Sequence, residues 1–175
     1  MDESDRSQPQ ATSPARARLR DAAREEAAGL EALQRRSSAI WDQYREQLAA
    51  HPDAIELPQN FIDSGWVRVA TGAGDTPVAF SVVIPAQEGI YELDGLFVEP
   101  DQMQRGIGRS LVQDACRRAR AAGAEGLEVI AGPAQVFYEK VGFVVIAPAQ
   151  TRFGPAARMR RELKSEPPSP HGFAL

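Results

Sequence analysis

The sequence predicts an α/β (α+β) domain in which helices pack against a central sheet. Apolar residues recur first at helical steps of three and four, then alternate with other residues as in strands, and then return to helical steps. The resulting order is two helices, three antiparallel strands and a β-α-β-α-β segment, which is typical of a sheet covered by helices. A length of 175 residues, with 43% hydrophobic and 25% charged residues, fits one such domain.

Two helices are expected near the N-terminus. The first starts at Ala15, and its apolar stripe consists of Leu19, Ala23, Ala27, Leu30 and Leu33. The second has Ser38 as its N-cap and stops before His51-Pro52, because proline cannot continue a helix. Residues 1–14 and 165–175 lack apolar periodicity, so we expect two disordered tails around a single domain of residues 15–164, with a helical part at 15–52.

The remaining elements follow from the change of period. Residues 67–70, 78–84 and 90–98 predict three strands of an antiparallel meander. Residues 107–122 return to helical spacing, and Gly123 is placed as a left-handed cap after that helix. A buried strand at 127–130, a helix from Ala134 and strands at 143–146 and 157–163 complete the prediction.

Charge and composition exclude several classes of function. A formal charge of −4 and a pI of about 5.3 give no long-range attraction for a polyanion, so neither nucleic acid nor a membrane is expected as a partner. Cys116 is the only cysteine, and His51 and His171 lie in no metal or triad pattern, so no metal is expected. The sequence shows no signal peptide and no apolar run of about 20 residues, which favours a cytoplasmic protein.

One glycine-rich loop has the pattern of a phosphate site. The segment from Met103 to Ser110 reads MQRGIGRS and lies between a strand that ends at Pro100 and a helix that begins near Gly106. Glycines let a backbone approach a ligand closely, and the start of a helix presents unpaired N–H groups and the positive end of its dipole. By itself the pattern is equally compatible with a plain turn from strand to helix.

A second motif makes the interpretation specific. Residues 134–143 read AQVFYEKVGF. Together with the loop they resemble the GNAT N-acetyltransferases, in which a strand, a loop [Gln/Arg]-x-x-Gly-x-[Gly/Ala], a helix, a strand and a segment similar to Ala-x-x-Phe-Tyr-x-x-x-Gly-Phe follow one another. The resemblance covers residues 91–146, the implied cofactor-binding core, and more weakly residues 67–163. It implies a mixed, mostly antiparallel central sheet flanked by helices, an extra N-terminal helix, and acetyl-coenzyme A as cofactor with coenzyme A as product.

The resemblance assigns two parts of the chain to the cofactor. Backbone amides of residues 104–109, with the Ser110 hydroxyl, would hold the pyrophosphate, and main-chain groups of the strand at 96–98 would pair with the pantetheine arm like an added strand. The implied set is Leu96, Phe97, Val98, Met103, Gln104, Arg105, Gly106, Ile107, Gly108, Arg109, Ser110, Phe137 and Tyr138. Met103 replaces the Gln or Arg of the family, so the contact of that polar side chain is missing, and Gly132-Pro133 replaces an Asn that many relatives carry, which puts one polar contact to the cofactor arm in doubt.

Amide formation from a thioester needs a base for the amine, a donor for the oxyanion and an acid for the thiolate. The resemblance makes Tyr138 the acid, and packing against Phe137 and Phe143 is the alternative role of this tyrosine. A main-chain N–H near Phe97 or Val98 is expected to bind the oxyanion.

Glu92 and Asp94 are the candidates for the base. They alternate on the strand at 90–98 and are expected to face one side together, opposite Leu93, Gly95 and Phe97. Burial near apolar groups would raise the pKa of either carboxyl toward the working range. Both acids are equally suited to binding the substrate's cation or to lying in solvent, with water as the base.

The predicted function is an N-acetyltransferase, an acyltransferase that moves an acetyl group from acetyl-coenzyme A to a primary amine of a small molecule, amino acid or peptide. A catalytically silent acyl-coenzyme A sensor is the alternative from a binding class. A transferase acting on aminoacyl-tRNA is disfavoured by the acidic balance of the chain.

The acceptor is not specified by these motifs. Trp41 and Tyr44 are interpreted either as packing residues or as walls of the acceptor site, in which case Asp42 and Glu46 would be available to an amine. Cys116 is interpreted as a buried packing residue, and the basic cluster as a solvated strand face formed by Arg158, Arg160, Arg161 and Lys164. A homodimer through a sheet edge is compatible with this architecture.

Overall fold

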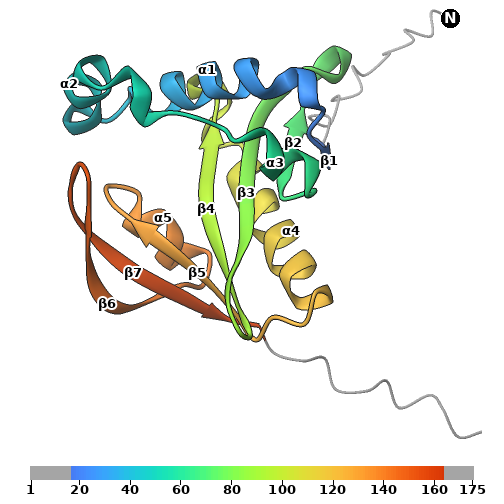
Figure 1. The fold of residues 1–175 in the computed structure, drawn as a ribbon, viewed down its shortest axis with the longest axis vertical. Helices are drawn as coiled ribbons and strands as arrows, with labels where there is room; N and C mark the ends of the chain where they lie inside the picture. Colours follow the sequence, from blue (N-terminus) through green and yellow to red (C-terminus); the bar gives the residue numbers. More distant parts are fainter. Residues whose placement is uncertain (1–16, 164–175) are drawn as a thin grey trace, which may run out of the picture.

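One sheet of seven strands organises residues 17–163, the part of the chain that this computed structural model describes (Figure 1). The strands lie in the order β1-β2-β3-β4-β5-β7-β6. They are β1 (Arg18–Asp21), β2 (Val67–Thr71), β3 (Pro77–Gln87), β4 (Ile90–Val98), β5 (Gly126–Ala131), β6 (Val144–Thr151) and β7 (Gly154–Glu162). Neighbouring strands are antiparallel except β4 and β5, which run parallel. The predicted fold class, a mixed and mostly antiparallel sheet flanked by helices, is confirmed.

Strands β4 and β5 share only one end of their length. Their ladder joins Ile90, Tyr91 and Glu92 to Gly126, Leu127 and Glu128, and no further pair continues it within the described chain. Figure 1 shows the two strands separating from this shared end like the arms of a V. The sheet therefore opens in the middle, at the half of β4 that leads into the glycine-rich loop.

Helices cover both faces of the sheet. Helix α1 (Ala27–Ser38) packs Leu30 and Leu33 into a cluster with Val82 of β3, and helix α4 (Ile107–Ala121) packs against Val83. Because adjacent residues of a strand point to opposite faces, these two clusters lie on opposite sides of the sheet. Full burial of each such leucine stabilises the fold by about 1.5–3 kcal/mol.

Several predicted elements match the observed ones. The meander strands, α4, β5 and α5 (Gln135–Lys140) are confirmed, Gly123 has the predicted left-handed conformation with φ of 90°, and β6 and β7 extend beyond their predicted ranges. Cys116 is buried in the cluster under α4, and burial raises the pKa of its thiol, as expected of a packing residue. The unpredicted elements are helix α3 (Gln59–Asp63) and the 3₁₀ turns η1 (Arg24–Glu26), η2 (Pro52–Ala54), η3 (Ala73–Asp75) and η4 (Pro100–Gln102).

The predicted first helix is wrong in its N-terminal half. Residues Arg18–Asp21 form β1, which pairs with β2, and α1 begins only at Ala27. Arg20 of β1 binds both Glu26 and Asp75, which fixes the strand next to the turn that follows β2. Pairing with β2 satisfies backbone groups at the edge of the sheet, and this long-range gain outweighs the local helical pattern.

The second helix begins later than predicted. Ser38 is the last residue of α1, and α2 (Asp42–Ala50) follows Trp41 as its N-cap. The helix ends before His51-Pro52, as expected. The predicted tails at 1–14 and 165–175, the predicted helix start at Ala15, His171 and Lys164 lie outside the described residues. Across residues 17–163, no helix combines the length and the apolar character that a membrane crossing requires.

Candidate functional site

The loop between β4 and α4 has the backbone geometry of an anion site. Gln104 has a φ of 61° and Gly106, the N-cap of α4, a φ of 81°. A positive φ is uncommon for a residue other than glycine, and such strain gathers at functional sites. Left-handed residues in such a loop turn neighbouring N–H groups inward, as in the anion-binding nests of phosphate loops.

Helix α4 adds donors at the same place. The N–H groups of its first turn have no acceptor within the helix, and the positive end of the dipole of a fifteen-residue helix lies beside them. Both the N–H and the hydroxyl of Ser110 donate to the Gly106 carbonyl, at 3.0 and 3.1 Å. The Ser110 hydroxyl therefore binds the start of the helix, and its contact with a phosphate stays a prediction.

Beyond its pairing with β5, strand β4 turns backbone groups toward the opening in the sheet. The N–H of Glu99 donates to Val78 of β3, so by alternation the N–H groups of Leu96 and Val98 point away from β3. The N–H of Val98 donates to the Ser37 hydroxyl at 3.2 Å. The N–H of Leu96 is directed into the opening between β4 and β5.

Two cavities meet in this opening. The larger, of about 490 Å³, runs along the glycine-rich loop between α1, β4 and α5 and is lined by Ser37, Ile40, Trp41, Leu96, Val98, Gln102, Met103, Gln104, Gly106, Ile107, Gly108, Arg109, Ala134, Phe137 and Tyr138. The smaller, of about 160 Å³, lies between β4, β5 and the start of α2. Ser37, Trp41, Leu96, Ala134 and Tyr138 line both.

Tyr138 stands at the junction of the two cavities. Its ring packs edge-on against Phe137 and Phe143, with centroids 5.1 and 5.6 Å apart, and only 7% of the residue is exposed. Burial raises the pKa of its phenol above the ordinary value. No residue among 17–163 hydrogen-bonds to the Tyr138 hydroxyl. The hydroxyl oxygen keeps some contact with solvent, since it is not one of the fully buried side-chain atoms that lack a partner. The tyrosine thus has both of its predicted roles available, as a packing residue and as a proton-bearing group that opens into a cavity.

The two candidate carboxylates are separated by a β-bulge. Gly95 pairs with Val82 and Leu93 with Val83, so Asp94 is an extra residue without a partner on β3. The predicted alternation is wrong here, because Leu93 packs on the α4 side and Phe97 on the α1 side of the sheet. Asp94 lines the smaller cavity together with Tyr138, whereas Glu92 lines neither of the two cavities.

Both carboxyls have a raised pKa. For Asp94 the cause is partial desolvation beside the cavity wall, although the residue as a whole remains exposed. For Glu92 desolvation is again the largest cause, followed by the charge of Asp94, while Arg158 lowers the pKa. A carboxylate with a raised pKa is a better proton acceptor at neutral pH than an ordinary one.

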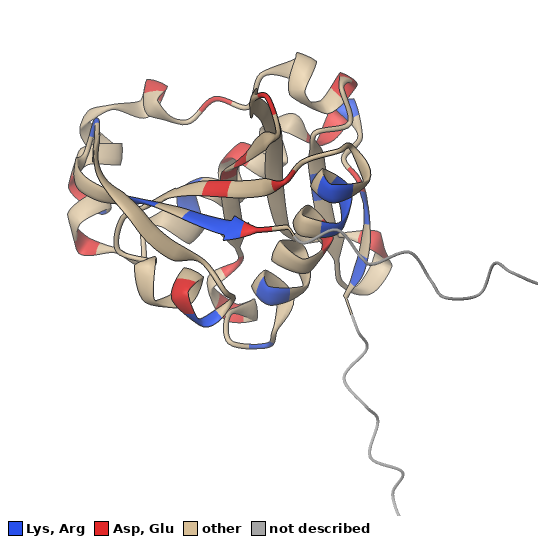
Figure 2. Ribbon diagram, turned by 90° about the horizontal axis from the view of Figure 1, so that it is seen from below, with Lys and Arg blue, Asp and Glu red and all other residues tan. Residues whose placement is uncertain are grey.

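Glu92 lies beside a buried ion-pair cluster. Its partner in the β4–β5 ladder is Glu128, which is 5% exposed and binds Arg158 at 2.9 Å and Arg160 at 2.6 Å. Although burial opposes it, the hydrogen bonds from these two arginines lower the pKa of Glu128. Figure 2 shows the arginines of β7 in blue along the strand. The interpretation as a solvated strand face fits Arg158, whose side chain is 46% exposed, but it omits the ion pairs of Arg158 and Arg160 with Glu128. Arg161 donates to the Val141 carbonyl.

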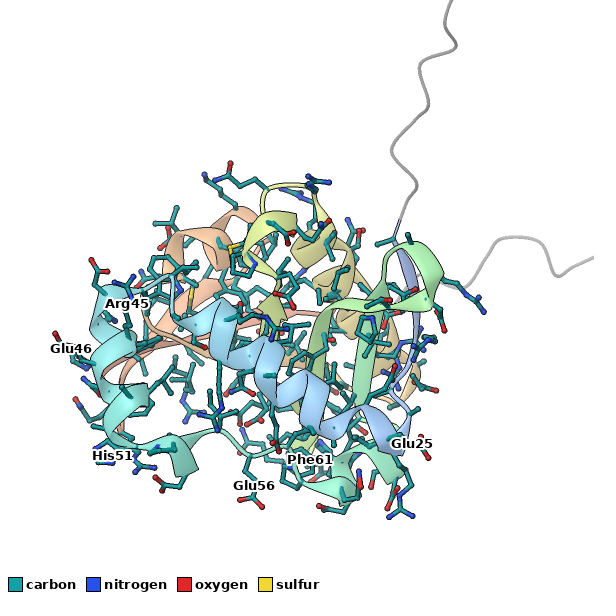
Figure 3. The ribbon with its side chains drawn as sticks, turned by 90° about the horizontal axis from the view of Figure 1, so that it is seen from above. Glu25, Arg45, Glu46, His51, Glu56 and Phe61 are labelled. Atoms are coloured by element: carbon teal, nitrogen blue, oxygen red, sulfur yellow. The ribbon has the colours of Figure 1, made fainter. Side chains whose placement is uncertain are left out.

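On the acceptor side, the structure brings Trp41 and Tyr44 into the wall of the smaller cavity. The acids of α2 do not join them. Asp42 is 93% exposed at its side chain and pairs with Arg45. Glu46 points away from the body of the molecule on the outer side of α2 (Figure 3). Asp94 is therefore the acid that this cavity offers to an amine.

Sequence reasoning placed much of the site and missed part of it. The larger cavity includes Leu96, Val98, Met103, Gln104, Gly106, Ile107, Gly108, Arg109, Phe137 and Tyr138, while Phe97 lines the smaller one and Arg105 neither. Ser37, Ile40 and Gln102 were not identified. Ser37 is a buried polar residue at the end of a helix, and burial of a hydroxyl is not visible in a sequence.

Comparisons with known proteins agree with this geometry. Residues 63–145 match the family model described as an acetyltransferase (GNAT) domain. No curated protein matches the sequence.

Solved structures extend the likeness to most of the chain. A GCN5-related N-acetyltransferase from Rhodopseudomonas palustris has a TM-score of 0.69 at 23% identity, over 87% of this chain and 99% of its own. PaiA N-acetyltransferase from Thermoplasma acidophilum, in complex with coenzyme A, has a TM-score of 0.67 at 20% identity, over 83% and 98%. The ribosomal-protein-S18-alanine N-acetyltransferase of Escherichia coli has a TM-score of 0.62 at 16% identity, over 87% and 97%.

Proposed function

Because the chain has the GNAT fold and its residues 63–145 match the acetyltransferase domain of that family, we propose that it transfers an acetyl group from acetyl-coenzyme A to a primary amine. The observation that carries the proposal is the position of Tyr138, which lines both the cavity along the glycine-rich loop and the smaller cavity with Asp94. A proton-bearing group that lines two adjoining cavities suits a reaction between two substrates, one bound in each cavity.

The residues of the larger cavity fit coenzyme A. The left-handed backbone at Gln104 and Gly106 and the first turn of α4 offer N–H groups to a pyrophosphate. The gap between β4 and β5, with the N–H of Leu96 directed into it, suits an extended amide-bearing arm that takes the place of a strand. Gly108 lies against Phe137, where a Cβ would be 3.3 Å from the ring, so a larger residue would narrow the groove.

When bound, acetyl-coenzyme A supplies the activated acyl group as a thioester. The glycine-rich loop would hold the phosphates, and the Leu96 N–H would orient the arm or its carbonyl oxygen. Asp94 would accept the proton of the ammonium group, directly or through water, and its raised pKa makes it a stronger base than an ordinary aspartate. Tyr138 keeps its proton on Oη until an anion develops next to it, because its raised pKa prevents earlier loss.

Thiol release in a panel of amines, measured next to thermal melting with acetyl-coenzyme A, tests this function. Saturating ligand at a hundredfold excess over its Kd should stabilise the protein by about 2.7 kcal/mol. Melting that shifts without thiol release from any amine would favour the silent sensor, and an unchanged melting curve would contradict both functions.

A further inference from the structure

We propose that the acceptor is a small monoamine with an apolar body and no carboxylate group, and that amino acids and polypeptide ends are poor acceptors. The inference rests on the proposed function and names the substrate class of that same site. It is carried by the charge of the smaller cavity and by the contacts that border its α2 side.

The charge of the smaller cavity fits a cation alone. Asp94 is the one charged residue among the described residues that line it, and the others are aliphatic, aromatic, glycine, proline or serine. The two arginines of β7 on this part of the sheet, Arg158 and Arg160, are held by Glu128. A carboxylate on the acceptor would therefore meet the negative charge of Asp94 in a cavity whose described lining offers no cation to pair with.

Aromatic walls favour the same class of acceptor. Trp41 and Tyr44 face the cavity from the start of α2, and Trp41 is 36% exposed although it is a large apolar residue. Aromatic faces attract a cation and bury the apolar body attached to it. An amine held at Asp94 would thus place its carbon skeleton between these two side chains.

Three contacts border the α2 side of the cavity. The Tyr44 hydroxyl lies so near Gly132 that a Cβ on this glycine would overlap it. The Tyr44 ring contacts the ring of Phe153, in the turn between β6 and β7, with centroids 5.9 Å apart. Next to it Arg152 pairs with Asp53 of η2 at 3.4 Å.

These contacts connect two parts of the chain that are far apart in the sequence. Figure 1 shows the β6–β7 turn reaching toward α2. A polypeptide bound by its N-terminus that leaves the cavity on this side has to pass these contacts and separate Tyr44 from Phe153. A volume of about 160 Å³ holds a small amine.

The test compares three probes with one skeleton: phenethylamine, phenylalanine and a tripeptide amide that begins with phenylalanine. Their Kd values are measured by calorimetry with and without saturating coenzyme A, so that the ranking does not depend on turnover. Phenethylamine should bind at least about tenfold more tightly than the other two, because each of these brings a group that the cavity cannot accommodate. Equal or tighter binding of phenylalanine or the tripeptide, or no binding of phenethylamine, would overturn the inference.

Two variants test separately the role of the Asp94 charge and the role of the contacts on the α2 side. Asp94→Asn should weaken the binding of phenethylamine by about tenfold and leave the binding of phenethyl alcohol, its neutral analogue, unchanged. The control Asp63→Asn, at an exposed ion pair, should change the binding of neither compound. The double variant Arg152→Ala with Phe153→Ala should improve tripeptide binding relative to phenethylamine, and the control Arg45→Ala should not. An unchanged ratio in the double variant, or equal weakening of amine and alcohol by Asp94→Asn, would contradict the proposal.

Failure of this inference can be distinguished from failure of the proposed function. If coenzyme A binds and peptides are acetylated best, the function stands and the acceptor class is wrong. If coenzyme A does not bind, the function fails, and the ranking of the three probes without cofactor still decides the acceptor class.

Discussion

The Ser37 hydroxyl accepts a hydrogen bond from the backbone N–H of Val98 at 3.2 Å, and so joins the end of α1 to β4 at the point where β4 has left β5. Ser37 is 7% exposed and lines both cavities. The contact satisfies a backbone donor that would otherwise face the opening of the sheet. It also leaves the N–H of Leu96 directed into the opening, whereas the sequence led us to expect a donor near Phe97 or Val98.

Ser37→Ala should destabilise the protein by about 1–3 kcal/mol, because the Val98 N–H loses its partner in a largely buried position. Urea unfolding measures the change. Ser38→Ala removes the neighbouring hydroxyl, which donates to and accepts from no described residue, and should cost less. Equal costs for the two variants would mean that the hydrogen bond to Val98 contributes nothing.

Tyr138→Phe should lower kcat by about 100-fold or more and leave the Kd of coenzyme A nearly unchanged, because it removes a proton without changing the shape of the cavity. Steady-state kinetics with the best amine, together with calorimetry, separate the two quantities. Tyr91→Phe at the far end of β4 is the matched control. A variant with wild-type kcat would leave Tyr138 with packing as its only role.

Gly132→Ala should raise the KM for the amine and leave coenzyme A binding unchanged. A Cβ at this position would overlap the Tyr44 hydroxyl, and the end of that flexible side chain has to move away. Tyr44 lines the smaller cavity but not the larger one, so we expect the change in binding to be confined to the amine. A change of the coenzyme A Kd with an unaltered amine KM would contradict the division into two cavities.

Asp94→Asn should raise the melting temperature at pH 7 while lowering activity. The folded-state pKa of Asp94 is raised, so its stabilising contribution is present at low pH and is lost as the pH rises through that pKa. At pH 7 the wild-type protein keeps a partly desolvated charge that asparagine does not have. The two melting curves should converge below the pKa of both states, and a variant that melts earlier at pH 7 would contradict the assignment.

The sequence predicted those parts of the site that local patterns determine. The glycine-rich loop, α4 and the Tyr138 segment lie where their motifs indicated, because turn chemistry and helical periodicity act over a few residues. The N-terminal strand was missed because Leu19 and Ala23 fit a helical stripe, and only the distant edge of β2 makes a strand more favourable there.

Two features of the chemistry depend on contacts that a pattern cannot reveal. The bulge at Asp94 breaks the alternation of β4. As a result Asp94 lines the smaller cavity, whereas Glu92 lies beside Glu128. The ring contact on the α2 side of the smaller cavity joins Tyr44 to Phe153, and these residues are separated by more than half of the chain. Neither is predictable without the three-dimensional register of the strands.

Calorimetric titration of acetyl-coenzyme A into the wild-type protein and Gly108→Val tests the central claim most directly. A valine side chain at position 108 would meet Phe137 and Val98 and narrow the groove beside the loop, whereas Gly29→Ala adds a Cβ that meets no atom within 4 Å and serves as control. The proposed function predicts one binding site in the wild-type protein and in the control, and at least about tenfold weaker binding by Gly108→Val. No binding to the wild-type protein, or equal binding by Gly108→Val, would contradict the assignment of this groove to the cofactor.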